Sequence, residues 1–176
     1  MQGKLLMRRA RILDDQNQNG AYYHILNRTA GTRDDRPFDD VEKEEFVKLL
    51  HNIATFYTIE IIGFCVMSNH YHIILWVPHS VPTPTDAIKR FQSFYPKHSA
   101  PDLGTLEMEH LQRRIRDLSD LGKQLQMRFT SWYNRTRPTK RRGGLWADRF
   151  KSLLIEGSKD HAALWSCLAY VALNPV

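Results

Sequence analysis

The feature that most constrains the fold is a pair of apolar segments joined by a very short turn. TIEIIGFCV (58 to 66) and HYHIILWV (70 to 77) are rich in β-branched and aromatic residues, and only Met67, Ser68 and Asn69 separate them. Two such segments with so short a connection predict an antiparallel hairpin. Side chains alternate along a strand, so both histidines are expected on one face. That face would carry His70, His72, Ile74 and Trp76, and the other Tyr71, Ile73, Leu75 and Val77.

Two further segments extend this pattern on the N-terminal side. AYYHILNRT (21 to 29) is short, apolar and preceded by Asn19-Gly20, which is typical of a strand. Asp39 with Glu42 three residues later resembles a capping box and predicts the start of a helix. The inner face of that helix would carry Phe46, Leu49, Leu50 and Ile53.

The C-terminal half predicts a helix, a strand and a helix. A helical pattern runs from about Thr105 to Thr136, with a break expected at Gly122. LWADRFKSLLIEG (145 to 157) predicts a bent or two-part strand. The last segment predicts a helix that is capped by Ser158 or Asp160 and stopped by Pro175.

The order of these elements predicts the fold class. Strand, helix, strand, strand, helix, strand is the ferredoxin-like, split βαβ arrangement of α+β proteins, here with an extra C-terminal helix. A chain of 176 residues fits a single domain, residues 1–176. Residues 78–118 predict an insertion or flexible excursion, because residues 78–104 hold five of the eight prolines; a short helix is expected at 85–94.

Positive charge is concentrated in one segment. Residues 111–151 hold twelve Lys or Arg against three acids, whereas acids gather at residues 34–45. The basic segment also contains Phe129, Trp132, Tyr133 and Trp146, and cations with flat rings suit a nucleic-acid groove. The alternative is an ordinary solvated basic helix and turn.

Cysteine usage and hydropathy predict a cytoplasmic protein. Cys65 and Cys167 are far apart, with no spacing typical of zinc sites or disulfide frameworks. The sequence shows neither a signal peptide nor an apolar stretch of the ~20 residues that a membrane span needs, so no membrane partner is expected.

Two pairs of residues could carry chemistry. His70 and His72 could both reach one divalent ion, although exposed strand faces carry polar residues anyway and two ligands are few for a tight site. Tyr170 and Asn174 are four residues apart and are expected on one face of the last helix. Tyrosine at the edge of an apolar stripe is commonly half-buried packing, and a phenol attacks only beside a metal, a base or a polarised electrophile.

Four blocks in order identify a family resemblance. MSNHYHIIL (67 to 75) resembles the histidine, hydrophobe, histidine (HUH) motif of nucleases that cut single-stranded DNA. YYHILNR (22 to 28), GGLWADRFKS (143 to 152) and AYVALNPV (169 to 176) fit the same family. The chain thus resembles HUH single-tyrosine transposases, most closely the REP-associated tyrosine transposases and the small insertion-sequence enzymes that move as single strands.

The resemblance implies a role for each site residue. Tyr170, on the helix before Asn-Pro, would be the catalytic nucleophile. His70 and His72 would hold Mg²⁺ or Mn²⁺, with Asn174 as the third metal ligand. Tyr71 is expected to point away from the metal. Attack by Tyr170 would give a 5′-phosphotyrosine and a free 3′-hydroxyl.

The expected DNA contacts lie in the basic segment. Relatives recognise imperfect palindromes folded as hairpins, so single-stranded or hairpin DNA is the expected partner. The candidates for phosphate or base contacts are Arg135, Arg137, Lys140, Arg141, Arg142, Trp146 and Arg149. For Trp146, simple core packing is an equal alternative.

The resemblance predicts a metal-dependent single-stranded DNA endonuclease and strand transferase. The main alternative is a non-catalytic ferredoxin-like nucleic-acid-binding protein, a degenerate transposase; a third is a phosphodiesterase that uses activated water. Some relatives are homodimers in which the tyrosine acts in trans and others are monomers, so both stay open. The sequence stops at Val176, where relatives continue with a basic segment, so truncation also stays open.

Overall fold

A four-stranded antiparallel sheet forms the centre of the fold. The computed structural model describes residues 19–32, 34–137, 143–155 and 161–174. Within these residues the strands are β1 (Gly20–Arg28), β2 (Glu60–Val66), β3 (His70–Pro78) and β4 (Lys151–Ile155), in the spatial order β2-β3-β1-β4. The predicted hairpin is confirmed as β2 and β3, and β1 pairs with both β3 and β4.

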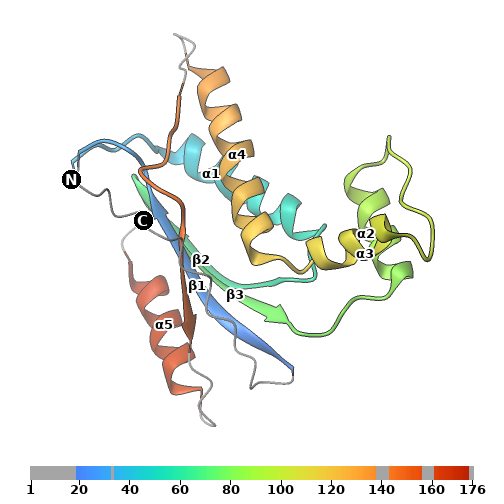
Figure 1. Ribbon diagram of the computed structural model, residues 1–176. Helices are drawn as coiled ribbons and strands as arrows, with labels where there is room; N and C mark the ends of the chain where they lie inside the picture. The colour runs from blue at the N-terminus through green and yellow to red at the C-terminus, as the bar shows by residue number, and fades with distance from the viewer. Residues whose placement is uncertain (1–18, 33, 138–142, 156–160, 175–176) are drawn as a thin grey trace, which may run out of the picture.

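Five helices in the described residues flank this sheet unequally. α1 (Asp40–Ala54) and α4 (Leu118–Thr136) cover one face, and α5 (Ala162–Leu173) lies on the other (Figure 1). α2 (Pro84–Phe94) and α3 (Leu106–Arg114) lie to one side, beyond the sheet. The chain is therefore an α+β protein with a C-terminal helix, as expected.

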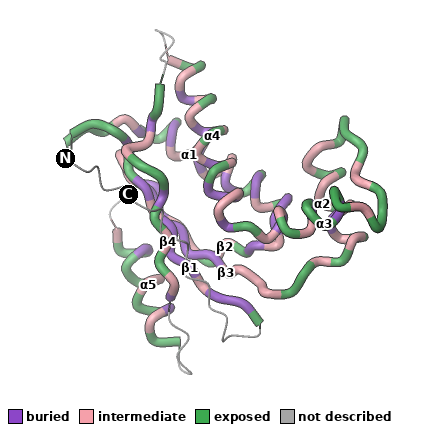
Figure 2. The backbone as a smooth tube through the Cα atoms, in the orientation of Figure 1, coloured by how far each residue is buried: buried purple, intermediate pink, exposed green. Residues whose placement is uncertain are grey.

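The two faces of the sheet bury different amounts of apolar surface. The large core cluster lies between the sheet and the α1–α4 layer, and β3 contributes Tyr71, Ile73 and Leu75 to it, each 0% exposed. The second cluster is small and lies under α5, where Ile74, Ile155 and Val171 meet. Figure 2 shows the buried strands between these layers and the more exposed α2–α3 excursion.

The start of α1 follows the predicted capping box. The Asp39 side chain accepts hydrogen bonds from the backbone N–H groups of Val41 and Glu42, and the Glu42 carboxylate accepts from the N–H of Asp39 at 3.0 Å. These bonds give partners to backbone N–H groups at the start of the helix, which have no partner within the helix itself. The predicted inner face is confirmed for Phe46, Leu50 and Ile53, all 0% exposed, whereas Leu49 is half-buried.

The predicted break at Gly122 is wrong. Gly122 lies inside α4, and a Cβ at this position would collide with the ring of Phe150. The glycine therefore permits close packing between the helix and the segment before β4, and it does not end the helix. The actual break falls earlier, between α3 and α4, where Asp117 caps α4 by accepting from the N–H of Ser119 at 2.6 Å.

Residues 78–118 contain two helices. The helix predicted at 85–94 is confirmed as α2, with Thr83 as its N-cap, and α3 follows. Polar contacts join this excursion to the rest of the molecule: Arg90 donates to the carbonyl oxygen of Tyr57 at 2.6 Å, and Arg114 donates to Asp120 at 2.7 Å. In the described residues this segment is a helical excursion that contacts α4 and the residues before β2.

The last two elements agree with the expected order but differ in detail. The predicted two-part strand appears as an isolated bridge between Trp146 and Thr29, followed by β4. His161, with a φ of 53°, occupies the N-cap position of α5 without a side-chain cap; the expected caps Ser158 and Asp160 lie outside the described residues. No described helix is both long enough and apolar enough to span a bilayer.

Candidate active site

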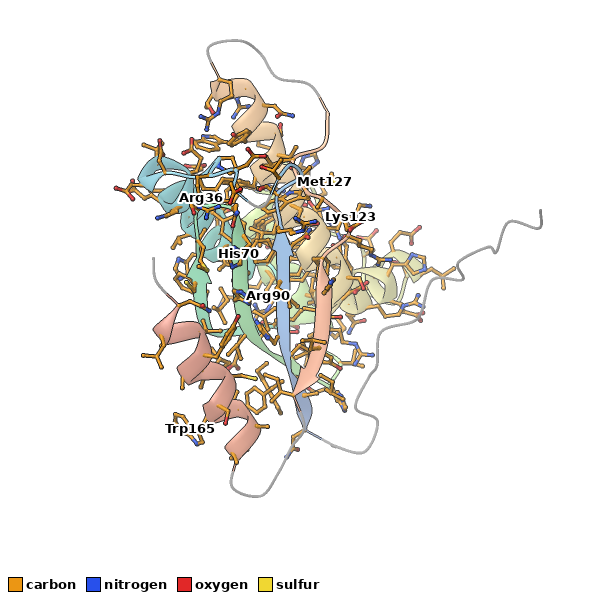
Figure 3. All side chains as sticks on the ribbon, turned by 90° about the vertical axis from the view of Figure 1, so that its left-hand side faces the viewer. Arg36, His70, Arg90, Lys123, Met127 and Trp165 are labelled. Carbon is orange, nitrogen blue, oxygen red and sulfur yellow. The ribbon has the colours of Figure 1, made fainter. Side chains whose placement is uncertain are left out.

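The two motif histidines lie on the face of the sheet that α5 covers. They are alternate residues of β3, so their side chains point to the same side, and their ring centroids are 5.2 Å apart. His72 is 4% exposed and His70 is half-buried. Figure 3 shows His70 on β3 with Arg36 close by. The predicted common face of the two imidazoles is thus confirmed.

A third histidine belongs to the same cluster. Nε2 of His24, on β1, lies 2.8 Å from Nδ1 of His72 in a buried hydrogen bond. The pairing of β1 with β3 creates this contact, because Leu26 is opposite His72 and His24 is opposite Ile74, which makes the histidines diagonal neighbours. The sequence predicted that His24 lies in a strand. It did not predict how that strand pairs with the one that holds His72, 48 residues later.

All three imidazoles favour the neutral form. Burial lowers the pKa of His24. Burial, and then the positive charge of Arg36, lower the pKa of His70. Burial and the neighbouring His24 and His70 rings lower the pKa of His72 to about 4. A neutral imidazole has the nitrogen lone pair that a metal ion requires.

Tyr170 of α5 meets this cluster. Its ring centroid lies 5.4 Å from that of His72 and 6.4 Å from that of His24, both in edge-on geometry. The helix is fixed on the sheet by Leu164 and Val171, which are buried, while Tyr170 is 54% exposed. Within one chain, the structure therefore brings Tyr170 and the histidines together and keeps the phenol open to solvent.

Asn174 follows the last residue of α5, four positions after Tyr170. It is the C-cap of α5, with φ −64° and ψ 127°, so the helix ends at this residue. The physical reason is the following proline in the sequence, which disfavours the helical conformation of the residue before it. The Asn174 backbone oxygen lies 4.0 Å from Sγ of Cys65, and its side chain lines a hollow beside α1 and β2.

The donor set partly fits a divalent ion. His70 and His72 each use Nδ1 in a hydrogen bond, and their Nε2 atoms have no hydrogen-bond partner among the described residues. The side-chain nitrogen of Asn174 is buried without a hydrogen-bond partner. No group of three or more His, Cys, Asp or Glu suited to a metal occurs in the described residues.

The expected basic DNA-binding residues have different surroundings in the structure. Arg135 and Arg149 are exposed, as a phosphate contact requires. Arg137 instead pairs with the buried carboxylate of Glu42 and lies over the Tyr133 ring, 4.0 Å from its centroid. The remaining basic candidates, Lys140, Arg141 and Arg142, lie outside the described residues.

Trp146 has a packing role in this structure. Its ring meets those of Phe46, Tyr71 and Phe129 in the large core, and its Nε1 donates to the carbonyl oxygen of Gln126 at 3.3 Å. The core-packing alternative thus has direct support. One edge of Trp146 also lines an open groove between α4 and residues 144–150, together with Lys123, Met127 and Arg149. Figure 3 shows Lys123 and Met127 along α4.

Comparison with solved structures finds a transposase structure with the same fold. A structure described as the REP-associated tyrosine transposase bound to a REP hairpin matches with a TM-score of 0.58 and 14% identity, covering 97% of this chain and 73% of that one. A putative transposase from Deinococcus radiodurans R1 matches with a TM-score of 0.43 and 19% identity, covering 93% and 96%. No curated protein matches the sequence.

The sequence also matches a protein family. Residues 17–114 match the family described as "Transposase IS200 like". The matched range includes His24, His70 and His72 and ends before α4 and Tyr170. The match covers more than half of the chain, so the chain belongs to the IS200-like transposase family, and this membership implies a role in DNA transposition.

Proposed function

We propose that this chain is a metal-dependent single-stranded DNA endonuclease and strand transferase of the HUH type, with Tyr170 as its nucleophile. One observation carries the proposal: the Tyr170 and His72 rings lie 5.4 Å apart although β3 and α5 are far apart in the sequence. The strand order β2-β3-β1-β4 supports a ferredoxin-like reading of the fold. Family membership supports DNA as the substrate.

Cleavage of a phosphodiester needs an in-line nucleophile and stabilisation of negative charge. In the proposed reaction Oη of Tyr170 loses its proton and bonds to phosphorus, while the bond from phosphorus to the 3′ oxygen breaks. The leaving oxygen takes up a proton and becomes a 3′-hydroxyl, and the other end stays on Tyr170 as a 5′-phosphotyrosine. One phosphodiester replaces another, so the step needs no nucleotide triphosphate and the 3′-hydroxyl can reverse it.

The protein would hold a divalent cation on one side of the scissile phosphate. His70 and His72 present neutral imidazoles there, and Mg²⁺ or Mn²⁺ would supply Lewis-acid stabilisation of the phosphate charge. We propose Asn174, four residues after Tyr170 at the end of α5, as a third ligand. Exposure of Tyr170 supports access of a single strand to this face of the sheet.

We propose hairpin-bearing single strands as the DNA substrate. The solved transposase with this fold is described with a REP hairpin, and the basic segment supplies cations for phosphates. Arg135 and Arg149 are the exposed candidates among the described residues. Lys140, Arg141 and Arg142 remain candidates on charge alone, whereas Arg137 and Trp146 would act mainly through the structure around them.

A labelled-strand assay tests this proposal. Hairpin oligonucleotides are incubated with Mn²⁺ and protein and resolved on a denaturing gel. A 3′ label should move to the protein band, because the 3′ fragment stays on Tyr170, and a 5′ label should appear on a free, shorter strand. Tyr170→Phe should form no adduct. Tyr22→Phe is the matched control, because Tyr22 lies on the same face of the sheet and packs against Trp76.

Each other outcome has a definite meaning. An adduct that survives Tyr170→Phe would remove the nucleophile assignment. Cleavage without an adduct would favour a phosphodiesterase that uses activated water. Hairpin binding with neither cleavage nor adduct would favour the non-catalytic binding protein.

A further inference from the structure

Each motif histidine has a dedicated hydrogen-bond partner on its Nδ1 atom. For His70 the partner is Oδ1 of Asn69, at 2.7 Å, and for His72 it is Nε2 of His24, at 2.8 Å. A neutral imidazole carries one proton on one of its two nitrogens, and only the bare nitrogen can bind a metal. The partner on Nδ1 therefore determines whether Nε2 is available.

Asn69 determines the proton position of His70. The orientation of its amide is set from the other end, because Nδ2 donates to the carbonyl oxygen of Asp35 at 3.0 Å. Its backbone is held as well, since its carbonyl oxygen accepts from the N–H of Thr29 at 2.8 Å. Oδ1 thus faces His70, and an amide oxygen only accepts. Nδ1 of His70 must carry the proton, which leaves the Nε2 lone pair free.

The contact between His24 and His72 allows two arrangements. If His24 donates from Nε2, then the proton of His72 sits on its own Nε2, and this ring has no free lone pair. If His72 donates from Nδ1, its Nε2 is bare and His24 carries its proton on Nδ1. The rings are 8% and 4% exposed, and such burial disfavours a charged imidazolium in either. Only the second arrangement leaves His72 able to bind a cation.

We infer that His24 and Asn69 are positioning residues that hold His72 and His70 in the Nδ1–H form and aim both Nε2 lone pairs at a divalent cation. The inference rests on the proposed function, because it assigns partners to the metal-binding pair. Such outer partners fix the tautomer and the ring orientation of metal-ligating histidines. His24 accepts a hydrogen bond in this role and does not touch the ion.

The geometry separates this role from direct ligation by His24. A metal held between His24 and His72 would separate their nitrogens by more than one hydrogen bond, because each metal–nitrogen bond is about 2.0–2.1 Å long and the bonds diverge. The observed separation is 2.8 Å. The three histidines also do not form a three-ligand metal cluster among the described residues.

Nuclear magnetic resonance tests the tautomers without any substitution in the measured protein. Metal-free protein labelled with ¹⁵N is examined by long-range ¹H–¹⁵N correlation at neutral pH, and His70→Gln and His72→Gln assign the two rings. We expect Nδ1 protonated and Nε2 bare in both. A proton on Nε2 of either ring would overturn the assignment for that ring's partner.

Mn²⁺ titration by calorimetry tests the consequence for binding. His24→Leu should weaken Mn²⁺ binding by about 10- to 100-fold, the usual cost of losing an outer partner. His24→Gln should recover part of this loss, because its amide oxygen can accept from His72. His110→Leu, at an exposed position of α3, should match the parent protein. Unchanged binding by His24→Leu, or equally weak binding by His24→Gln, would overturn the positioning role.

The adduct assay distinguishes this inference from the proposed function. If no adduct forms but Mn²⁺ binding depends on His24 as described, the positioning role stands and the proposed reaction fails. If the adduct forms on Tyr170 and Mn²⁺ binding ignores His24, the reaction stands and the positioning role fails. Thermal unfolding of each variant checks its fold, and the tautomer measurement on the parent protein holds even if His24→Leu does not fold.

Discussion

The two faces of the sheet can be compared at neighbouring residues of one strand. Tyr71 and His72 are adjacent in β3, and their side chains point in opposite directions. Tyr71 is 0% exposed and packs against Phe46 and Trp146 in the large core. His72 is almost as buried, at 4%, yet its neighbours are His24 and the exposed Tyr170.

The two faces differ in how completely apolar side chains fill the space between sheet and helix. The α1–α4 face is closed by two helices and a continuous apolar cluster. The α5 face is covered by one helix and a small cluster, which leaves polar rings between sheet and helix and Trp165 exposed to solvent. Substitutions on the first face should therefore act on the free energy of unfolding, and those on the second on metal binding and cleavage.

The largest expected effect is on the α1–α4 face. Phe46→Ala should lower the free energy of unfolding by about 3–5 kcal/mol, because it leaves a cavity among Tyr71, Phe129 and Trp146. Trp165→Ala, on the outer side of α5, should change it by no more than about 0.5 kcal/mol. Chemical denaturation measures both. Comparable losses would contradict the placement of Phe46 in the core and of Trp165 on the surface.

The next effect is on the α5 face. His70→Ala should lower metal-dependent cleavage by at least about 100-fold, the scale for removing one group that stabilises transition-state charge. Hairpin affinity should change little, because it comes mainly from the basic segment. Labelled-strand cleavage and fluorescence anisotropy measure the two quantities.

The matched control is the adjacent residue on the opposite face. Tyr71→Phe removes a hydroxyl that accepts from Gln126 at 3.1 Å, so it should cost about 1 kcal/mol of stability and leave cleavage intact. Parallel loss of cleavage and affinity in His70→Ala would count against separate roles for the site and the basic segment.

A smaller effect is expected where α4 joins the excursion. Asp120 accepts from the Tyr57 hydroxyl and from Arg114, each at 2.7 Å. Burial raises the pKa of Asp120, but these bonds and the charge of Arg114 outweigh it and lower the pKa overall. Asp120→Asn should cost about 1–2 kcal/mol at pH 7, at the low end of bonds to charged groups because Arg114 is 37% exposed.

The pH dependence of this contribution has a definite sign. The folded-state pKa of Asp120 lies below the unfolded value near 3.8, so the stabilisation is complete above that value. It is lost as the pH falls below 3.8 and through the folded-state pKa. Parent protein and Asp120→Asn should therefore differ most near neutrality and converge in acid. A difference that grows below pH 4 would contradict the cause given for the lowered pKa.

Local patterns predicted most of the fold because they report on neighbouring residues. The capping box at Asp39 and the alternation through β3 both depend on residues within a few positions, and both are confirmed. Gly122 shows the limit of such patterns: its reason is Phe150, which contacts it from another segment, and a glycine in a helical pattern does not reveal that partner. The end of α5 at Asn174 follows from a local rule as well, because a proline disfavours a helical ψ at the residue before it.

The candidate site was predicted in part because its motif is local and its supporting residues are not. His70 and His72 are two residues apart, and alternation alone puts them on one face. His24 lies next to His72 only because β1 pairs with β3 in the observed register. Arg137 pairs with Glu42, which lies 95 residues earlier in the sequence. A count of charges does not reveal such a distant partner, so it could not distinguish the paired Arg137 from the exposed Arg135.

The smallest expected effect separates these two arginines. Arg135→Ala should weaken hairpin binding several-fold and reduce the slope of log affinity against log salt by about 1, the share of one phosphate contact. Arg137→Ala should instead lower the free energy of unfolding, because it leaves the buried Glu42 carboxylate unpaired. The slope of log affinity against log salt should not change in this variant. Anisotropy at several salt concentrations and chemical denaturation measure both variants. A reduced slope in Arg137→Ala with unchanged stability would assign this arginine to the DNA surface and remove it from the α1–α4 core.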